Sequence, residues 1–319
     1  MVRKTAAVRL KAGKEERRVQ RQQIGRLRDA MVLPATQKRY FAAVARFLRH
    51  LGADATMPTS FDTLDAALSG FLEALWEDGE PRGFAADALS GLGHYIPASK
   101  GHLRGSWRLY KAWTHLELPN RALPFTLIHV YAVAERCRAK GWTDTMVLLL
   151  LGFSTFARTG ELFRARRRDF VIDVHRERAS WTLPLSKTGQ RDGIQEALTI
   201  SDPWVRALVA GFLERLQPNQ LLSGVNDATQ RRRLRSACAD LQLAFDYRWY
   251  SVRRGGATHW YQQAQDLNAL LVKGRWGALK TAKVYIQDAQ AQLSELQVPP
   301  RHAAWLRSLA LALCPGLEG

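Results

Sequence analysis

The sequence predicts a mainly α-helical protein with a small antiparallel β-sheet, built as two helical units. Apolar residues recur at intervals of three and four along most of the chain, which is the spacing of amphipathic helices. Short stretches that look like strands are confined to residues 170–200. Residues 119–124 contain two prolines and little apolar pattern, which indicates a linker between the units. A chain of 319 residues is long enough for two domains of ordinary size.

Residues 1–33 are expected to form a basic arm ahead of the first unit. The first 28 residues carry ten Lys and Arg and two Glu, and they have little apolar content to bury. Such a composition is typical of a segment that is flexible or that becomes ordered on a polyanionic partner.

Residues 34–118 are expected to form a four-helix unit. The helices are predicted over residues 36–51, 61–76, 83–95 and 101–116, and Ser60 is placed to cap the second. The helical spacing of the first and fourth helices rests on the apolar residues Phe41, Val44, Phe47, Leu48, Leu103, Trp107, Tyr110 and Trp113. Core packing is assigned to the Trp and Phe residues of this unit. Phosphate contacts are assigned to the basic residues Lys38, Arg39, Arg46, Lys100, Arg104, Arg108 and Lys111.

Residues 125–319 are expected to form a second unit, which contains the sheet. A helix over 125–140 is followed by an apolar one that Thr143 caps and that delivers Arg158 at its end. Strands are predicted at 170–174, 180–183 and 196–200, with a turn at 186–189 between the second and third. Ser201 or Asp202 then caps a helix that runs to residue 216.

Two later segments of this unit leave alternatives open. A basic helix ahead of Tyr250 either contacts the DNA backbone or forms a solvated face, and it carries Arg231, Arg232, Arg233 and Arg235. Residues 302–313 form an apolar terminal helix, which packs either on its own unit or on a neighbouring protomer.

Composition narrows the class of partner. The formal net charge of +18 and the isoelectric point near 10.4 favour a polyanion. We expect no membrane span, because no apolar run approaches 18 residues, and no secretory signal, because the basic N-terminus lacks an apolar region. The three cysteines are far apart and show no metal-ligand spacing, which fits a reducing compartment.

Five residues together suit strand transfer on a phosphodiester. Arg158 and Arg253 provide two guanidinium forks, each of which can bind two phosphate oxygens. Tyr285 provides an oxygen nucleophile, which nearby cations would help to ionise. Lys187, in the string Ser-Lys-Thr-Gly, can protonate the leaving 5′ oxygen from a flexible turn. Trp276, nine positions before Tyr285, offers an indole N–H to a phosphate oxygen.

These strings resemble the tyrosine recombinases, the phage-integrase family. The resemblance rests on Arg-Thr-Gly-Glu-Leu at 158–162, Arg-Arg-Gly-Gly-Ala-Thr at 253–258, Gly-Arg-Trp at 274–276 and the single Tyr285. It implies that the first unit is the SAM-like core-binding domain and the second the catalytic domain. It also implies that Glu161 orients Arg158 and that Arg254 lies near DNA. Tyr250 stands where the family usually has a catalytic histidine. A tyrosine hydroxyl can form a hydrogen bond to a phosphate oxygen but is a poorer base near neutral pH, so we expect Tyr250 to do a weaker version of the histidine's work.

The resemblance implies a site-specific recombinase or integrase that forms a 3′-phosphotyrosine intermediate, and a mobile-element origin is consistent with it. We expect no metal and no nucleotide cofactor, because the phosphotyrosine bond conserves the energy of the cleaved phosphodiester. The expected partner is double-stranded DNA, with a monomer in free solution and a homotetramer on paired sites. The compartment would be the cytoplasm of a prokaryote or the nucleus of a eukaryote. Two alternatives remain: a type IB topoisomerase-like enzyme, and a catalytically silent DNA-binding protein that keeps the fold.

Overall fold

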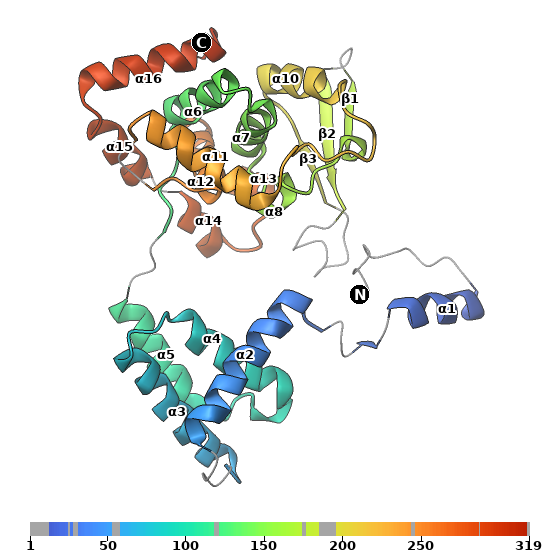
Figure 1. Cartoon of the computed structure of the whole chain (residues 1–319), viewed down its shortest axis with the longest axis vertical. Helices are drawn as coiled ribbons and strands as arrows, with labels where there is room; N and C mark the ends of the chain where they lie inside the picture. The colour runs from blue at the N-terminus through green and yellow to red at the C-terminus, as the bar shows by residue number, and fades with distance from the viewer. Residues whose placement is uncertain are drawn as a thin grey trace. The chain divides into compact units, whose positions relative to one another are not determined.

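The computed structural model describes residues 13–24, 26–27, 31–52, 58–117, 121–173, 177–184, 196–243, 246–286 and 288–317. These residues divide into two compact units on either side of positions 118–120 (Figure 1). Within the predicted basic arm, Lys14–Ile24 forms helix α1. Across the described part of the chain, every helix is too short or too polar to span a lipid bilayer.

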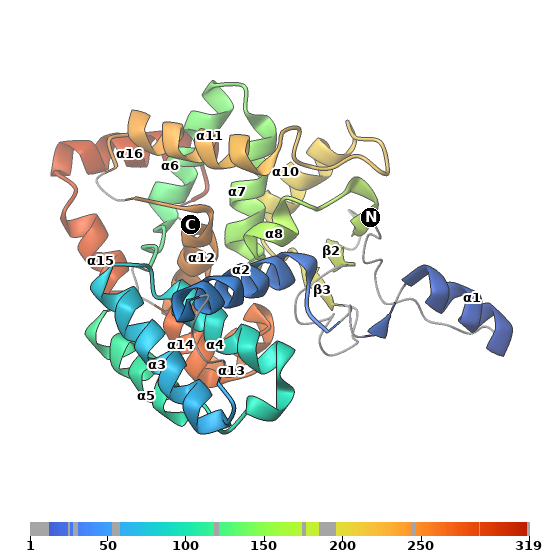
Figure 2. The same cartoon turned by 60° about the horizontal axis from the view of Figure 1, so that its bottom comes forward.

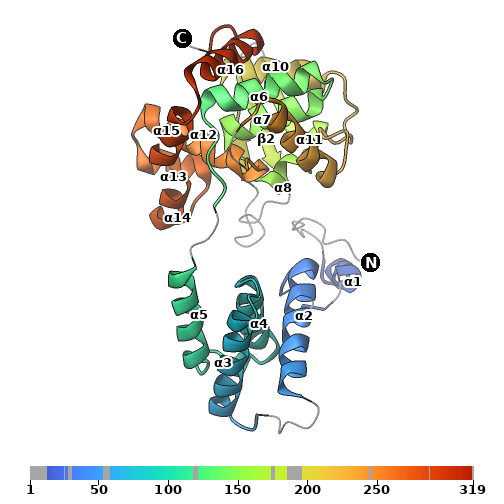
Figure 3. The ribbon, with the colours of Figure 1, turned by 60° about the vertical axis from the view of Figure 1, so that its left-hand side comes forward.

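The first unit is a four-helix bundle, and all four predicted helices are present (Figure 3). They are α2 (Pro34–Leu51), α3 (Phe61–Glu77), α4 (Gly83–Tyr95) and α5 (Arg104–Leu116), with a short 3-10 turn η2 (Pro97–Ser99) before α5. Helix α2 packs chiefly on α4, and α3 packs chiefly on α5. Ser60 caps α3 as predicted, because its hydroxyl accepts a hydrogen bond from the backbone N–H of Thr63 at 3.1 Å.

The core of this unit includes some of the predicted aromatic residues and excludes others. Phe47 and Trp113 are buried, as predicted. Phe41 and Trp107 were expected in the core but are 67% and 48% exposed. The buried stripe of α2 runs through Ala43 and Phe47, and Phe41 lies about 200° around the helix from Ala43. The apolar pattern therefore predicted the helix correctly and misplaced part of its buried face.

The second unit is built around α7 (Thr143–Thr155), which is buried along most of its length. Helices α6 (Leu127–Ala139), α12 (Trp249–Ala264) and α10 (Pro203–Leu213) pack around it (Figure 1). The remaining helices are α8 (Thr159–Leu162), η3 (Arg167–Asp169), α11 (Asp227–Asp240), α13 (Leu267–Gly274), α14 (Leu279–Tyr285), α15 (Asp288–Leu296) and α16 (Pro300–Leu313). The predicted cap of α7 is wrong by one position: Trp142 precedes the helix, and Thr143 is its first residue.

A three-stranded antiparallel sheet lies at one side of this unit (Figure 2). Its strands are β1 (Phe170–Asp173), β2 (Arg178–Leu183) and β3 (Glu196–Thr199), in the order β1-β2-β3. Phe170, Trp181 and Leu198 lie in register across the strands and are all buried in the core of the unit. The predicted turn at 186–189, with Lys187, lies outside the described residues. Asp202 caps α10 by accepting from the N–H of Val205 at 2.9 Å.

The terminal helix α16 packs on α6 of its own chain (Figure 1). Leu306, Ala310 and Cys314 join the main core of the second unit, and the His302 ring donates to the carbonyl oxygen of Leu241 at 2.8 Å. Of the two alternatives for this helix, the structure has the one in which it packs on its own unit. Packing on a neighbouring protomer stays a prediction, and Trp305 of the same helix is 43% exposed.

Candidate active site

Helix α12 carries the central residues of the site and lies close to two backbone segments. A Cβ at Gly255 would overlap the carbonyl oxygen of Phe125, and a Cβ at Gly256 would overlap that of Phe153. The N–H of Phe125 also donates to the carbonyl of Ser251 at 3.2 Å. The glycine pair therefore lets α12 approach both the start of the second unit and the end of α7.

Arg253 lies at the centre of the site and is 1% exposed. Its Nη2 donates to the carbonyl of Gly274 at 2.6 Å, and its Nη1 donates to the carbonyl of Phe156. Its guanidinium carbon lies 5.0 Å from the ring centroid of Trp276 and 5.2 Å from that of Tyr285. Burial lowers the pKa of Arg253 to about 10, which still leaves the guanidinium charged at neutral pH.

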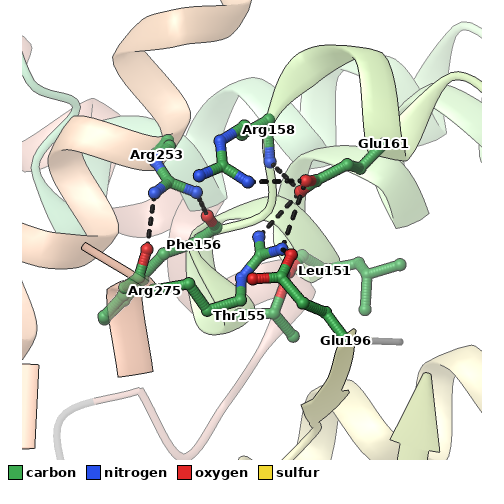
Figure 4. A network of polar contacts seen from close by, with 9 residues as sticks. Leu151, Thr155, Phe156, Arg158, Glu161, Glu196, Arg253 and Arg275 are labelled. Carbon is green, nitrogen blue, oxygen red and sulfur yellow. Dashed lines mark hydrogen bonds and ion pairs between the residues drawn. The ribbon is translucent and has the colours of Figure 1, made fainter. Parts of the chain in front are cut away.

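Arg158 lies where α7 has ended and α8 begins. Phe156 ends α7 with a left-handed backbone (φ 54°), and Arg158 then precedes the first turn of α8. Glu161 accepts from the backbone N–H of Arg158 at 2.7 Å and from its Nη1 at 2.9 Å. The predicted contact between Glu161 and Arg158 is therefore present. In the view of Figure 4, the side chain of Arg158 lies between Arg253 and Glu161.

Tyr285 is the last residue of α14, and its ring packs against Trp276 with centroids 4.6 Å apart. The hydroxyl of Tyr250 donates to the hydroxyl of Tyr285 at 2.6 Å. Burial opposes ionisation of Tyr285, but this hydrogen bond and the charge of Arg253 outweigh it and lower the pKa of Tyr285. Burial and the same phenol pair raise the pKa of Tyr250 to about 12. Of the two phenols, Tyr285 is the one that ionises first.

Trp276 was predicted to offer its indole N–H to a phosphate, and its ring forms one wall of the site. The ring folds back over Gly274, where a Cβ would overlap it. Trp276 is 8% exposed, and its Nε1 lies near Tyr285 without forming a well-aligned hydrogen bond to any described residue. A buried N–H in this state can donate a hydrogen bond to an anionic oxygen of a ligand.

Two side chains of α12 hold the end of the helix that carries Tyr285. Arg254 donates through Nη2 to the carbonyl of Val284 at 2.5 Å, and through Nη1 to the carbonyl of Ala122. Thr258 donates to the carbonyl of Tyr285 at 3.1 Å. The last carbonyls of a helix have no partner within it, so these bonds fix the C-terminus of α14. Arg254 was predicted to bind DNA, and this stays a prediction; here it is 0% exposed and both its Nη groups bind backbone carbonyls.

The other predicted DNA contacts remain predictions, and these basic residues differ in their exposure and in their partners. Lys38, Arg104 and Lys111 are exposed on the first unit, where Arg39 is also exposed and pairs with Asp87 at 3.4 Å. On α11, Arg232 and Arg235 are exposed, and Arg231 is exposed with its guanidinium over the ring of Phe163. Arg233 pairs with Asp144 at 2.8 Å and lies over Trp142, so it also has a packing role.

One residue of the site was not predicted from the sequence. Arg275 binds Glu161 through both Nη atoms, at 2.7 and 3.2 Å, and binds Glu196 at 3.0 Å (Figure 4). The string Gly-Arg-Trp at 274–276 contains Arg275 but gave it no role, because both of its partners are distant in sequence. The described His, Cys, Asp and Glu side chains do not gather in threes that could hold a metal ion.

No protein-family model matches the sequence, and the curated proteins contain no match. Among solved structures, the chain is similar to a lambda integrase tetramer bound to a Holliday junction, at 15% identity and a TM-score of 0.58, over 82% of this chain and 74% of that one. It is also similar to a lambda integrase dimer bound to a COC′ core site, at 17% identity and a TM-score of 0.57, with the same coverage. A Tn1549 transposon integrase in complex with transposon right end DNA matches at 10% identity and a TM-score of 0.55, over 83% of this chain and 95% of that one. The chain therefore has the fold of the tyrosine recombinases.

Proposed function

We propose that this protein is a site-specific DNA recombinase or integrase that cleaves and rejoins DNA strands through a 3′-phosphotyrosine intermediate. The observation that carries the proposal is the environment of Tyr285. One phenol, with its pKa lowered, lies against a buried arginine and an indole; the phenol is at the end of α14, the arginine is on α12, and the indole is in the loop between α13 and α14. The similarity to DNA-bound integrases supports the same reading.

The scissile phosphate would bind between Arg158 and Arg253. Guanidinium forks bind non-bridging oxygens two at a time, and they stabilise the charge that develops on those oxygens in the transition state. Arg253 is held rigidly by two carbonyls, so little reorganisation is needed when the phosphate arrives. The buried N–H of Trp276 would supply a further donor.

The reaction would begin with attack of the Tyr285 phenolate oxygen on phosphorus. The new Oη–P bond leaves a 3′-phosphotyrosine, and the bond from phosphorus to the 5′ oxygen breaks. Lys187 would give its proton to that oxygen, as predicted from its place in the sequence. Rejoining reverses these steps, with a 5′-hydroxyl of the same or a second strand as the nucleophile. No external energy source is required, because each phosphodiester bond is exchanged for another.

Tyr250 would act on the nucleophile in this scheme, whereas the sequence suggested a contact with the phosphate. A phenol with a pKa of about 12 keeps its proton at neutral pH, so it cannot serve as the base. It can stabilise the Tyr285 phenolate as a hydrogen-bond donor, and the 2.6 Å separation suits that role. The proton of Tyr285 would then pass to solvent.

The direct test is capture of the covalent intermediate. The full chain is incubated with a pool of nicked duplexes of randomised sequence, in which the nick lets the cleaved end diffuse away. We expect an adduct that survives denaturant and maps to Tyr285 by mass spectrometry. Tyr285→Phe should abolish the adduct with DNA binding nearly unchanged, while Tyr261→Phe, a matched change on α12, should retain it. An adduct on Tyr250 or Tyr261, or none with the parent protein, would overturn the proposal.

The DNA site selected in this experiment then distinguishes a recombinase from a topoisomerase. A recombinase joins ends from two duplexes once the selected site is placed on both, whereas a topoisomerase only relaxes a supercoiled circle. The catalytically silent alternative predicts no adduct at all. The ordered surroundings of Tyr285, Arg253 and Arg158 support an active enzyme over that alternative.

A further inference from the structure

Arg275 lies between two carboxylates that are almost completely removed from solvent. The side chains of Glu161 and Glu196 are 5% and 13% exposed, and that of Arg275 is 9% exposed. Burial alone would raise the pKa of Glu161, but the hydrogen bonds and charge of Arg275, followed by those of Arg158, lower it. Both carboxylates are therefore balanced mainly by this one guanidinium.

The carboxylate of Glu161 is shared between two arginines. Arg275 uses both Nη atoms on its two oxygens, and Nη1 of Arg158 shares one of these oxygens, Oε1, with Arg275. A carboxylate that pairs with one arginine tends to take both ends of its fork. The presence of Arg275 therefore limits how strongly Glu161 draws on Arg158 (Figure 4).

Arg275 also links three parts of the site through its own backbone. It has a left-handed conformation (φ 54°), which a residue other than glycine rarely adopts. Gly274 just before it accepts from Arg253, and Trp276 just after it packs on Tyr285. Glu196 is the first residue of β3, the strand that follows the predicted Lys187 turn. A strained residue with this many fixed partners is typical of a functional site.

We propose that Arg275 is a positioning residue that neutralises Glu161 and Glu196 and so keeps Arg158 available for the scissile phosphate. This inference rests on the proposed strand-transfer function. Without Arg275, two buried negative charges would stand beside the phosphate, repel it, and compete with it for Arg158. The residue does not touch the reacting atoms; it acts through Glu161 and Arg158.

The test is whether removing a negative charge repairs the loss of Arg275. Arg275→Met should slow single-turnover cleavage of the selected nicked duplex by about 100-fold, since small misplacements of catalytic groups have effects of this size. Its DNA affinity, measured in a Tyr285→Phe background, should change little. Adding Glu161→Gln to Arg275→Met should raise the rate in part, because one of the two unbalanced charges has gone and Glu196 remains. Lys280→Met, which removes an exposed charge from α14, is the control and should leave the cleavage rate unchanged.

Arg275→Lys is the second test variant, and it is measured in case Arg275→Met does not fold. It keeps the charge and loses the fork, so it should retain more activity than the methionine variant. The proposal fails if Arg275→Met cleaves as fast as the parent, if Arg275→Lys is as slow as Arg275→Met, or if Glu161→Gln makes the double variant slower still. Failure of the proposed function looks different, because then the parent protein itself forms no adduct at Tyr285.

Discussion

Tyr250 and Tyr285 share one short hydrogen bond, and their surroundings move their pKa values in opposite directions. Tyr285 has its pKa lowered and Tyr250 has its pKa raised to about 12. Under the proposed function, this division fits Tyr285 as the nucleophile and Tyr250 as its hydrogen-bond donor, without a histidine. The pair thus accounts for the tyrosine that departs from the usual family pattern at position 250.

The phenol pair predicts a particular dependence of cleavage on pH. Attack requires the Tyr285 phenolate, so the rate should rise with pH and level off below the ordinary tyrosine pKa of about 10. Tyr250→Phe removes the donor, so the midpoint should move to higher pH. A hydrogen bond to a charged group is worth about 1.5–3 kcal/mol, so cleavage at neutral pH should fall about tenfold or more. Single-turnover rates across pH measure this, and an unchanged midpoint would mean that Tyr250 only packs.

Individual residues of the site differed in how well the sequence predicted them. Arg158, Glu161, Arg253 and Tyr285 stand in short strings whose spacing matches a known chemistry, and the fold brings them together. The partner of Tyr250 was not predicted, because the two hydroxyls are 35 positions apart and only the packing of α12 against α14 joins them. Arg275 was missed for the same reason, since its partners lie 114 and 79 positions away.

At the scale of elements, helix α6 carries a buried histidine with a consequence for stability. The ring of His129 is bonded to the Tyr247 hydroxyl at 3.1 Å, and burial lowers its pKa from 6.5 to about 4. Between pH 6.5 and about pH 4, the imidazole of His129 is therefore protonated in the unfolded chain and neutral in the folded chain. The free energy of unfolding should fall as pH drops from about 6.5 to about 4, by an amount on the order of 3 kcal/mol.

Urea unfolding at several pH values tests this assignment. His129→Gln should flatten the slope in that window, because the group that titrates is gone. His115→Gln, at an exposed position of α5, is the matched control and should leave the slope as it is. If both variants keep the parent slope, another group causes the acid sensitivity.

The terminal helix α16 is part of the core of the second unit, so its loss should destabilise the protein. Leu306 is 1% exposed in the main core. Leu306→Ala should lower the free energy of unfolding by about 2–5 kcal/mol, as for other buried leucines. Leu296→Ala at the end of α15, where the leucine is 81% exposed, should change it by less than about 0.5 kcal/mol. Equal effects of the two changes in urea unfolding would mean that α16 is not docked in solution.

Element boundaries were predictable where a local signal defines them. The hydroxyl of Ser60 and the carboxylate of Asp202 cap their helices as expected. The packing partner of α16 was not predictable, because an apolar stripe indicates that a helix is buried but does not indicate which surface it packs on. The buried face of α2 was misjudged for a related reason. The apolar residues of α2 extend around more of its surface than the part that packs on α4.

At the scale of the whole molecule, the oligomeric state should depend on DNA, and the affinity for DNA should depend on salt. We expect a monomer in free solution and a tetramer when two copies of the selected site are present, as sedimentation would show. With a net charge of +18, the logarithm of the DNA affinity should fall linearly with the logarithm of salt concentration. A tetramer without DNA, or an affinity that salt leaves unchanged, would contradict these expectations.

The close approach of α12 through Gly255 and Gly256 has a consequence for the ancestry of this chain. Any replacement of either glycine adds a Cβ that would overlap a backbone oxygen, and backbone cannot move aside as a side chain can. A lineage that drifts in sequence must therefore keep this pair or lose the fold. The integrases of similar structure are only 10% to 17% identical to this chain. A search keyed to Arg-Arg-Gly-Gly should thus find distant relatives that comparison of whole sequences no longer detects.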